Sequence, residues 1–595
     1  QHNKETYMPT SPRSPRAFFP ADLTPLITSG WQTNKFDKSI PFWAEVDGIQ
    51  FTETGIRRKP GKSLLSALTS EPIRGLVATE EFDTKVVYAG SLSNIYRWKQ
   101  DSPTAAAVVV GSGFNLINTS GASSWDSGNS IWDAGASAWD DGVIAAASWS
   151  FTNFGTWVFA ADGVGPLKIK KSNETFAELQ VNKISGVNIT AGGINHAVND
   201  TLTFSGGSGS GLTATVTAVN GGAVARLKVT NFGSGFSATT SLTQASTSGS
   251  GTGLTATATM PDCPFIRVSA VDKSGPHLLA INYDKVATDH PYDVAWCSED
   301  DPDTWVASAT NSAGSLTLRE ASTQLRCIVP LGEAKAIYTE SEMFILNYIG
   351  APFYFGYETA MASGVGAVSA KAVVSVDRVN YGLSKRGLFM TDGNSVERLG
   401  DLEGINKYIA ENIAEGEYDQ VCAYHNKENN EVVWSIPFKN TIPTTEITYN
   451  YSNNTFSKRT ENSSAFLEAG VFRHAMSANS TGSLFYENGG SSAHSTVATT
   501  KAHDLEDPYA VKELTSIRVG KTGLGNPKVE IGWASEIDDD PTFNPSDTFY
   551  TTDDYKGHDL RTSGRYLFLR ISSNDPTDTW EISNIVVKGK VRGSR

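Results

Sequence analysis

The sequence is poor in the residues that build disulfide frameworks and metal sites. Its 595 residues include four cysteines and nine histidines. Cys263, Cys297, Cys327 and Cys422 stand far apart, with no Cys-x-x-Cys pair, which argues against a structural zinc site. Four cysteines are too few to form a stabilising disulfide framework in a chain of this length. We therefore expect free cysteines in a protein made in a reducing compartment.

Long hydrophobic runs are also missing. No stretch approaches the roughly 18 consecutive apolar residues that a membrane-spanning helix needs. The polar start Gln1-His2-Asn3-Lys4-Glu5 shows no hydrophobic core of a secretory signal. The sequence therefore predicts neither a membrane-spanning segment nor a signal for export.

Positive charge is in short supply. The chain has 49 Lys and Arg residues against 64 Asp and Glu residues, a formal net charge of −15. A DNA-gripping surface needs clustered cations, so this balance argues against one, although an acidic wall would let a duplex slide past. A basic run does occur at Arg57-Arg58-Lys59, before a Pro60-Gly61 turn signal. We expect an exposed loop there and take its three cations as candidate interaction residues.

Catalytic motifs are absent from the sequence. It contains no Gly-x-Ser-x-Gly elbow, no phosphate-binding loop and no His-Glu-x-x-His. The acidic runs 299–303 and 538–540 are compatible with a calcium site, but solvated turns explain them better. Glycosidase carboxylate pairs are set by folding, so spacing leaves them open. We predict no catalytic residue, no cofactor and no metal, and hence a protein that is not an enzyme.

What the sequence does have is a recurring β-hairpin unit. Two strands rich in aromatic and β-branched residues flank Gly, Asn or Asp turns, which accept the positive φ of tight hairpins. The strand pairs are 86–90 with 95–98, 157–160 with 167–169, 380–383 with 387–390, and 432–436 with 447–450. Repeated hairpins predict an all-β protein that must protect many sheet edges.

Radial repetition protects such edges, and it predicts a β-propeller. Six or seven candidate blades lie near 76–99, 146–180, 265–305, 325–349, 378–400, 420–457 and 465–487. One amphipathic helix is expected from Asp401 to Glu415.

Composition divides the chain into five parts. We expect a Pro-rich arm at 1–30, the first part of the propeller at 31–184, an inserted β knob at 185–262, the second part of the propeller at 263–505, and a sandwich-like domain at 506–595. The knob contains a duplication, because Gly209–Thr215 recurs as Gly251–Thr257. Its alternating Thr and Ala residues indicate folded strands and not a flexible linker.

A tryptophan repeat stands between two of the predicted blades. Trp125, Trp132 and Trp139 are each followed by Asp and, two residues later, by Gly. The glycines disfavour a coiled coil, so a meander of turns is expected. These tryptophans either pack on the sheet below or form an aromatic contact surface for a neighbouring subunit or a sugar.

Several short stretches together resemble the tail nozzle proteins (tail tubular protein B-like) of short-tailed bacteriophages. They are Gly55–Gly61, Trp149–Val158, Trp296-Cys297-Ser298 with Trp305, Tyr381-Gly382-Leu383, and Ser563–Leu567. The resemblance implies a β-propeller body with further β domains. It also implies a six-fold ring below the portal and adaptor, through which DNA leaves the virion. The segment 185–262 departs from this pattern.

The expected function is that of a structural subunit of a phage tail nozzle. As expected partners we name five further copies of the chain in a homo-hexamer, the phage adaptor and other tail proteins. Viral duplex DNA would pass through the lumen without sequence-specific binding. The protein would reside in the virion after assembly in the host cytoplasm. One alternative is a receptor- or carbohydrate-binding tail protein, and another is a propeller hydrolase.

Overall fold

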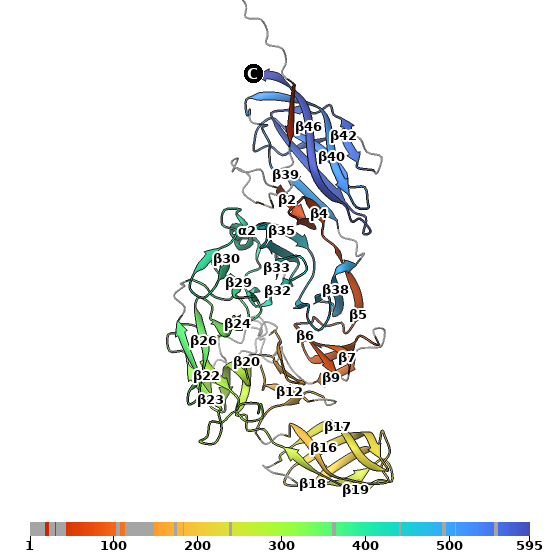
Figure 1. The fold of residues 1–595 in the computed structure, drawn as a ribbon, viewed down its shortest axis with the longest axis vertical. Helices are drawn as coiled ribbons and strands as arrows, with labels where there is room; N and C mark the ends of the chain where they lie inside the picture. Colours follow the sequence, from red (N-terminus) through yellow and green to blue (C-terminus); the bar gives the residue numbers. More distant parts are fainter. Residues whose placement is uncertain are drawn as a thin grey trace, which may run out of the picture.

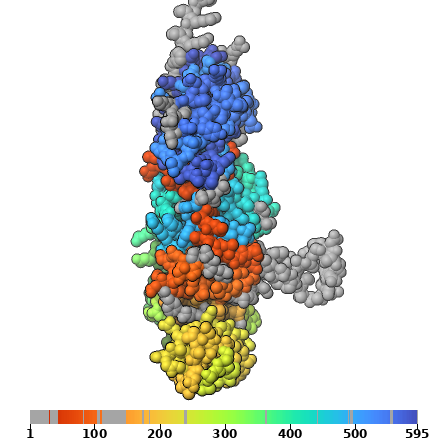
Figure 2. Space-filling model, turned by 90° about the vertical axis from the view of Figure 1, so that its right-hand side faces the viewer, coloured from red at the N-terminus to blue at the C-terminus, as the bar shows by residue number. Residues whose placement is uncertain are grey.

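The fold was analysed in a computed structural model of the chain. It describes residues 18–22, 30, 32, 43–81, 83–102, 108–112, 148–171, 175–181, 184–236, 241–359, 364–439, 442–490, 495–505, 507–552 and 557–594. These residues form an all-β structure with one short α-helix and one 3₁₀ turn. Three bodies follow one another along its longest axis. The C-terminal sheets lie at one end, a body of seven sheets in the middle, and a separate six-stranded sheet at the other end (Figures 1 and 2).

The middle body consists of seven four-stranded antiparallel sheets. The first is β6 (Gly75–Glu81), β7 (Thr84–Gly90), β8 (Asn94–Lys99) and β9 (Val108–Ser112). The second is β10 (Ser150–Phe154), β11 (Trp157–Ala161), β12 (Lys168–Lys170) and β13 (Ala177–Glu178). The third is β20 (Phe265–Ser274), β21 (His277–Lys285), β22 (Thr288–Trp296) and β23 (Gly314–Thr317).

The remaining four sheets follow in chain order. The fourth is β24 (Cys327–Leu331), β25 (Ala334–Tyr338), β26 (Met343–Gly350) and β27 (Tyr354–Thr359). The fifth is β28 (Val373–Val376), β29 (Val379–Ser384), β30 (Gly387–Thr391) and β31 (Val396–Arg398). The sixth is β32 (Cys422–Asn426), β33 (Glu431–Ile436), β34 (Thr445–Asn450) and β35 (Thr455–Thr460). The seventh is β36 (Ala465–Leu467), β37 (Met476–Ala478), β38 (Ser483–Gly490) and the early strand β5 (Gly61–Ala67).

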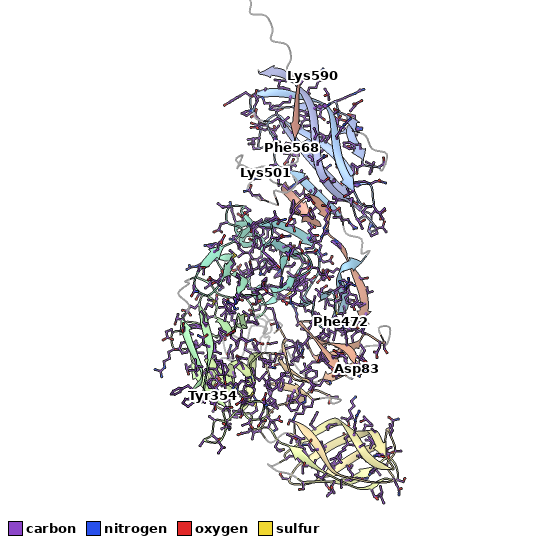
Figure 3. All side chains as sticks on the ribbon, in the orientation of Figure 1. Asp83, Tyr354, Phe472, Lys501, Phe568 and Lys590 are labelled. Atoms are coloured by element: carbon purple, nitrogen blue, oxygen red, sulfur yellow. The ribbon has the colours of Figure 1, made fainter. Side chains whose placement is uncertain are left out.

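The first strands of successive sheets are neighbours in space. Strand β6 lies beside β10, β10 beside β20, β20 beside β24, β24 beside β28, β28 beside β32, β32 beside β36, and β36 again beside β6. A separate apolar cluster fills the space between each pair of successive sheets. Phe472, labelled in Figure 3, shows one such contact: its ring centroid is 6.0 Å from that of Trp98 in the first sheet.

All four hairpins predicted from the turn residues are present. Val87 pairs with Trp98, Phe159 with Ile169, Leu383 with Leu388, and Val432 with Tyr449. The turn chemistry acts locally: at the next turn of the fifth sheet, an Asp392 carboxylate oxygen accepts hydrogen bonds from the backbone N–H of Asn394 and Ser395, at 3.0 and 2.8 Å.

The expected helix is present but short. The α-helix α2 spans Ile405–Asn412 instead of Asp401–Glu415, and the 3₁₀ turn η1 (Tyr418–Gln420) follows it. Gly404, at φ 75°, adopts a left-handed conformation that stops the helix on one side, and Ile413 is extended on the other. Ile405 and Ile409 face the core, as the apolar periodicity predicts.

The stretch between the second and third sheets forms a body of its own, which we call the knob. Its strands are β14 (Gly186–Ile194), β15 (Thr201–Ser205), β16 (Ser210–Asn220), β17 (Ala223–Ser234), β18 (Ser241–Thr247) and β19 (Thr252–Thr259). They pair in the order β14-β19-β18-β15-β16-β17, and β14 also lies against β17. The duplicated segments occupy equivalent places: Gly211 and Gly253 have φ 82° and 81°, and Phe236 covers Gly209 as His196 covers Gly251.

The C-terminal body contains two sheets. The seven-stranded sheet has the order β3 (Ile49–Phe51), β4 (Ile56–Arg58), β46 (Glu581–Ser594), β40 (Ala510–Thr522) and β43 (His558–Asp559), with β1 (Phe18–Asp22) on β46 and β44 (Ser563–Gly564) on β40. The five-stranded sheet has the order β2 (Trp43–Asp47), β39 (Thr496–Thr500), β45 (Tyr566–Ser573), β41 (Lys528–Ala534) and β42 (Thr542–Tyr550).

Strand pairing in this body differs from the division made on composition. Strands β2, β3 and β4 lie in the range 31–184 and β39 lies in 263–505, yet all four complete the C-terminal sheets. The described part of the arm, β1, also pairs there. The reason is apolar burial: Trp43, Ile49 and Ile56 are fully buried in a cluster that contains Ile582 and Trp580. The same cluster continues into the fifth and sixth sheets, so it joins the C-terminal body to the middle body.

Candidate functional site

The basic run Arg57-Arg58-Lys59 lies inside the molecule. Arg58 belongs to β4, which pairs with β46, and its Nη1 donates to the Pro576 carbonyl at 2.8 Å. Lys59 Nζ donates to Thr448 Oγ1 at 2.8 Å and lies 3.7 Å from a Glu431 carboxylate oxygen. Both cationic side chains are buried, in contrast to the exposed loop that the sequence predicts.

The third member of the run is also engaged within the chain. Arg57 is half-buried; its Nε donates to Gln50 Oε1 at 2.7 Å and its Nη2 to Asn429 Oδ1 at 3.3 Å. The run therefore connects the C-terminal body to the sixth sheet. Sequence reasoning missed this because the partners lie hundreds of residues away.

The candidate tryptophans Trp125, Trp132 and Trp139 lie outside the described residues. Their role stays a prediction. The described tryptophan that follows them, Trp149, is fully buried, and its Nε1 donates to the Ser91 carbonyl at 2.7 Å. Its ring packs so closely on Gly90 that a Cβ there would lie 2.3 Å from Trp149 Cδ1. Trp149 thus joins the first and second sheets through packing.

Sequence reasoning did not find a fully buried charge cluster, which we call the closing network. It consists of Lys62 on β5, Glu487 on β38, Glu446 on β34 and Arg459 on β35. Lys62 Nζ lies 3.0 Å from Glu446 Oε1 and 3.0 Å from Glu487 Oε1. Arg459 Nη2 lies 2.6 Å from Glu446 Oε2 and 3.1 Å from Glu487 Oε2. The network therefore joins the sixth sheet to the seventh.

The pairing in the closing network outweighs the effect of burial on its charges. Burial alone would raise the pKa of Glu446, but Arg459 and Lys62 bring that pKa well below its ordinary value. Burial alone would lower the pKa of Lys62, but Glu446 and Glu487 raise it. Two cations and two anions thus stay ionised without net buried charge.

The sequence alone contains no signal for this network, but the burial of one of its strands marks it. Every residue of β34 is buried, including Glu446 between Thr445 and Ile447. A charged residue within a strand that is buried on both faces needs a partner, because an isolated buried charge is strongly unfavourable.

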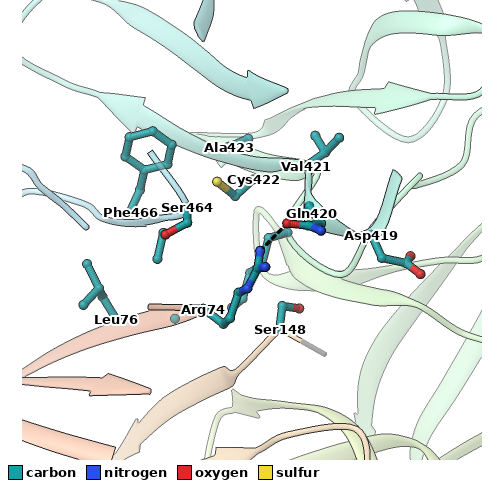
Figure 4. A pocket seen from close by; sticks show the side chains of 13 residues that line it. Arg74, Leu76, Ser148, Asp419, Gln420, Val421, Cys422, Ala423, Ser464 and Phe466 are labelled. Carbon is teal, nitrogen blue, oxygen red and sulfur yellow. Dashed lines mark hydrogen bonds between the residues drawn. The ribbon is translucent and has the colours of Figure 1, made fainter. Parts of the chain in front are cut away.

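A second group of polar residues surrounds a small pocket at the centre of the middle body, which we call the hub pocket (Figure 4). Part of its polar lining comes from residues one or two positions before the first strands of their sheets: Arg74 before β6, Lys371 before β28, Gln420 before β32, and Ser464 before β36. Arg74 Nη1 donates to Gln420 Oε1 at 2.5 Å. Burial is the main influence on Arg74 and lowers its pKa, although Cys422 and Glu417 oppose the shift.

A larger cavity of about 200 Å³ adjoins the hub pocket and shares Ser148 and Asp419 with it. Its two arginines are already paired. Arg267 Nη2 lies 2.8 Å from Asp284 Oδ1, and Arg326 Nη1 lies 2.9 Å from Asp419 Oδ1. The cations of this cavity therefore differ from those of the hub pocket in having carboxylate partners.

The four cysteines are free, as predicted, and all four are buried. Burial raises the pKa of Cys297, Cys327 and Cys422 to about 12. A thiol with such a pKa is neutral at physiological pH and is a poor nucleophile. Cys422 lines the hub pocket but carries no charge there.

The carboxylates of the acidic turn at 299–303 pair with other side chains of the same chain. Asp301 Oδ2 accepts the Thr304 hydroxyl at 2.7 Å, and Asp303 Oδ2 lies 2.9 Å from Lys171 Nζ. Across the described part of the chain, no group of three or more His, Cys, Asp and Glu residues is placed to hold a metal ion. The helices described there include none that is long and apolar enough to cross a membrane.

Comparisons with protein-family models and with curated proteins found no match to this chain.

Proposed function

We propose that the chain is a structural subunit of a bacteriophage tail nozzle, built on a seven-bladed β-propeller. One observation carries the proposal: seven four-stranded sheets follow one another in chain order, with neighbouring first strands and a return from β36 to β6. Radial repetition of this kind protects sheet edges and yields a rigid unit. The sequence motifs that resemble nozzle proteins supply the phage assignment.

Rigidity of the subunit supports a role in a ring under mechanical load. Strand β5, from residues 61–67, completes the seventh sheet beside β38, and Leu64 pairs with Phe485. The closing network then links the pair β5 and β38 to the sixth sheet through buried ion pairs. In the proposed propeller, the pairing of β5 with β38 resists opening, because separation would break buried ion pairs and expose apolar surface.

The elongated subunit would assemble side by side around an axis. In the proposed hexamer, six copies form a closed cyclic ring that contacts the phage adaptor and other tail proteins. Viral duplex DNA would pass through its lumen, and the net charge of −15 would oppose tight binding. The finished particle would belong to the virion.

Assembly is the decisive test. Mass photometry of the purified chain, with and without adaptor rings, should show six-fold particles, and cryo-electron microscopy should show a ring. A chain that remains monomeric at micromolar concentration, with adaptor rings present, would contradict the nozzle proposal. Binding to duplex DNA should be weak at physiological salt, and nanomolar affinity would contradict a passive lumen.

A carbohydrate- or receptor-binding tail protein is the second candidate, and the knob favours it. Its surface carries rows of hydroxyl pairs across neighbouring strands, such as Thr190 with Thr255 at 2.9 Å and Thr213 with Thr230 at 2.9 Å. Charged residues in 186–259 are few: Asp200, Arg226 and Lys228. Glycan-array binding by the full chain, together with a trimeric assembly, would favour this candidate over the nozzle.

A further inference from the structure

The hub pocket brings together two cations from distant parts of the chain. Arg74 precedes the first strand of the first sheet, and Lys371 stands in front of the first strand of the fifth sheet. Because the first strands converge at the centre, both side chains line one pocket. The close-up in Figure 4 shows Arg74 extending across the pocket toward Gln420, with Cys422 and Ser464 nearby.

Within the described ranges of the chain, neither cation has a carboxylate partner. Arg74 is 7% exposed and donates through Nη1 to a neutral amide, while its buried Nε finds no acceptor among the described residues. Lys371 Nζ makes no hydrogen bond or ion pair with the part of the chain that the structure describes. Burial lowers the pKa of Lys371, because removal from water disfavours the charged form of the ammonium group.

The nearby carboxylates are engaged elsewhere. Asp419, the acidic residue in the pocket lining, pairs with Arg326 at 2.9 Å. Asp272 lies 2.6 Å from Lys335 Nζ, and Glu417 accepts a hydrogen bond from Gln420 Nε2 at 2.5 Å. The thiol of Cys422 is neutral at physiological pH. The pocket therefore holds an excess of positive charge in a partly dehydrated setting, which an anion would balance.

The size of the pocket limits the ligand. Its volume is about 50 Å³. One water molecule needs roughly 10–15 Å³ of cavity volume, so the pocket has room for about three to five groups the size of an oxygen atom. A tetrahedral oxyanion meets this limit, whereas a nucleotide exceeds it. A planar guanidinium and an ammonium group are also the usual protein partners of phosphate.

We propose that the hub pocket binds a small tetrahedral oxyanion, inorganic phosphate or sulfate, between the Arg74 guanidinium and the Lys371 ammonium group. The anion would bridge the first sheet and the fifth sheet across the centre of the middle body. It would stabilise the folded chain in proportion to its concentration above the dissociation constant. This inference is independent of the proposed phage function.

The test measures phosphate binding directly, because phosphate and sulfate also stabilise proteins by exclusion from their surfaces. Equilibrium dialysis with radiolabelled inorganic phosphate, in chloride buffer, uses the full chain. We expect one saturable site, with sulfate competing. Lys371→Met should weaken binding at least tenfold, about 1.4 kcal/mol. Lys407→Met is the matched control, since Lys407 is 80% exposed on α2, and it should leave binding unchanged.

Three results would overturn the proposal: no saturable binding to the wild-type chain at millimolar phosphate, equal affinity in Lys371→Met and wild type, or displacement of phosphate by a short DNA duplex. Displacement by DNA would mean that the protein binds the phosphodiester groups of nucleic acid and not a free oxyanion in the hub pocket.

A measurement on the wild-type chain covers the case in which Lys371→Met does not fold. Acetylation of Lys371 by acetic anhydride, followed by mass spectrometry, should slow at least threefold when phosphate or sulfate replaces chloride. Lys407 in the same sample provides the internal reference and should react at the same rate in all three salts. An unchanged rate at Lys371 would overturn the proposal without any variant.

Discussion

The closing network and the hub pocket are both built from Lys and Arg side chains in the middle body, but they differ in pairing. In the closing network, Lys62 and Arg459 share Glu446 and Glu487, so two cations meet two anions. In the hub pocket, Arg74 and Lys371 have no carboxylate partner among the described residues. A satisfied cluster holds two sheets together, whereas an unsatisfied one is available to a ligand.

The largest expected effect comes from breaking the closing network. Glu446→Gln leaves Lys62 and Arg459 with Glu487 as their remaining anion, and hence an uncompensated buried positive charge. We expect the free energy of unfolding to fall by about 3–5 kcal/mol. Urea unfolding followed by tryptophan fluorescence measures this loss. The double variant Glu446→Gln with Lys62→Met restores charge balance, and it should recover part of the loss. A fall below about 1 kcal/mol in the single variant would contradict the assignment.

Acid should weaken the closing network next. The folded pKa of Glu446 and that of Glu487 lie below the ordinary value because Arg459 and Lys62 outweigh burial. Groups with depressed pKa values stabilise the fold above the unfolded pKa of about 4.3, and this stabilisation is lost as pH falls through the folded pKa. The urea midpoint should therefore drop as the pH falls below about 4.3. The charge-balanced double variant should show a smaller drop, and an equal drop would contradict this origin.

The hub pocket should respond much less to the loss of a charge. Arg74→Met removes a buried cation that lacks a carboxylate partner, at the cost of one hydrogen bond to Gln420. In chloride buffer we expect a change in the free energy of unfolding of less than about 1 kcal/mol, because the two effects offset each other. Urea titration measures it. A loss of the size expected for Glu446→Gln would show that Arg74 is a structural charge, and the contrast between the two clusters would fail.

The smallest effect is expected for an ion pair that is exposed to solvent. Lys407 and Glu411 form an ion pair at 3.7 Å on the solvent face of α2. Glu411→Gln should change the free energy of unfolding by less than about 0.5 kcal/mol, because water screens the pair. Measured in the same urea series, this variant separates the effect of burial from the effect of losing one carboxylate. A larger loss would indicate that Glu411 has a further role.

Local features were predicted well from the sequence because their causes are local. Strand composition, with Gly, Asn and Asp residues nearby, predicted four strand pairs, and all four form in the structure. The helix was placed correctly by its apolar periodicity, but its ends were not. The left-handed Gly404 and the extended Ile413 set them, and an amphipathic pattern contains neither signal.

Long-range features were not predicted. The basic run at 57–59 reads as a surface loop, yet Arg58 and Lys59 are buried against segments near 576 and 448. In the same way, β2 pairs with β39 and β4 pairs with β46, and both partners lie more than 400 residues away. The closing network was missed because β34 alternates polar and apolar residues, a pattern that places Glu446 in solvent, whereas the structure buries every residue of that strand.

The amino-acid sequence by itself determined the all-β class, the hairpins and the separate character of the 185–262 stretch, because turn preference and strand alternation act over a few residues. Tertiary structure alone decided which strands complete each sheet, which charges are paired, and where two cations without a carboxylate partner among the described residues line one pocket. Those outcomes depend on contacts between segments hundreds of residues apart, and burial changes the energy of a charge more than any local pattern can indicate.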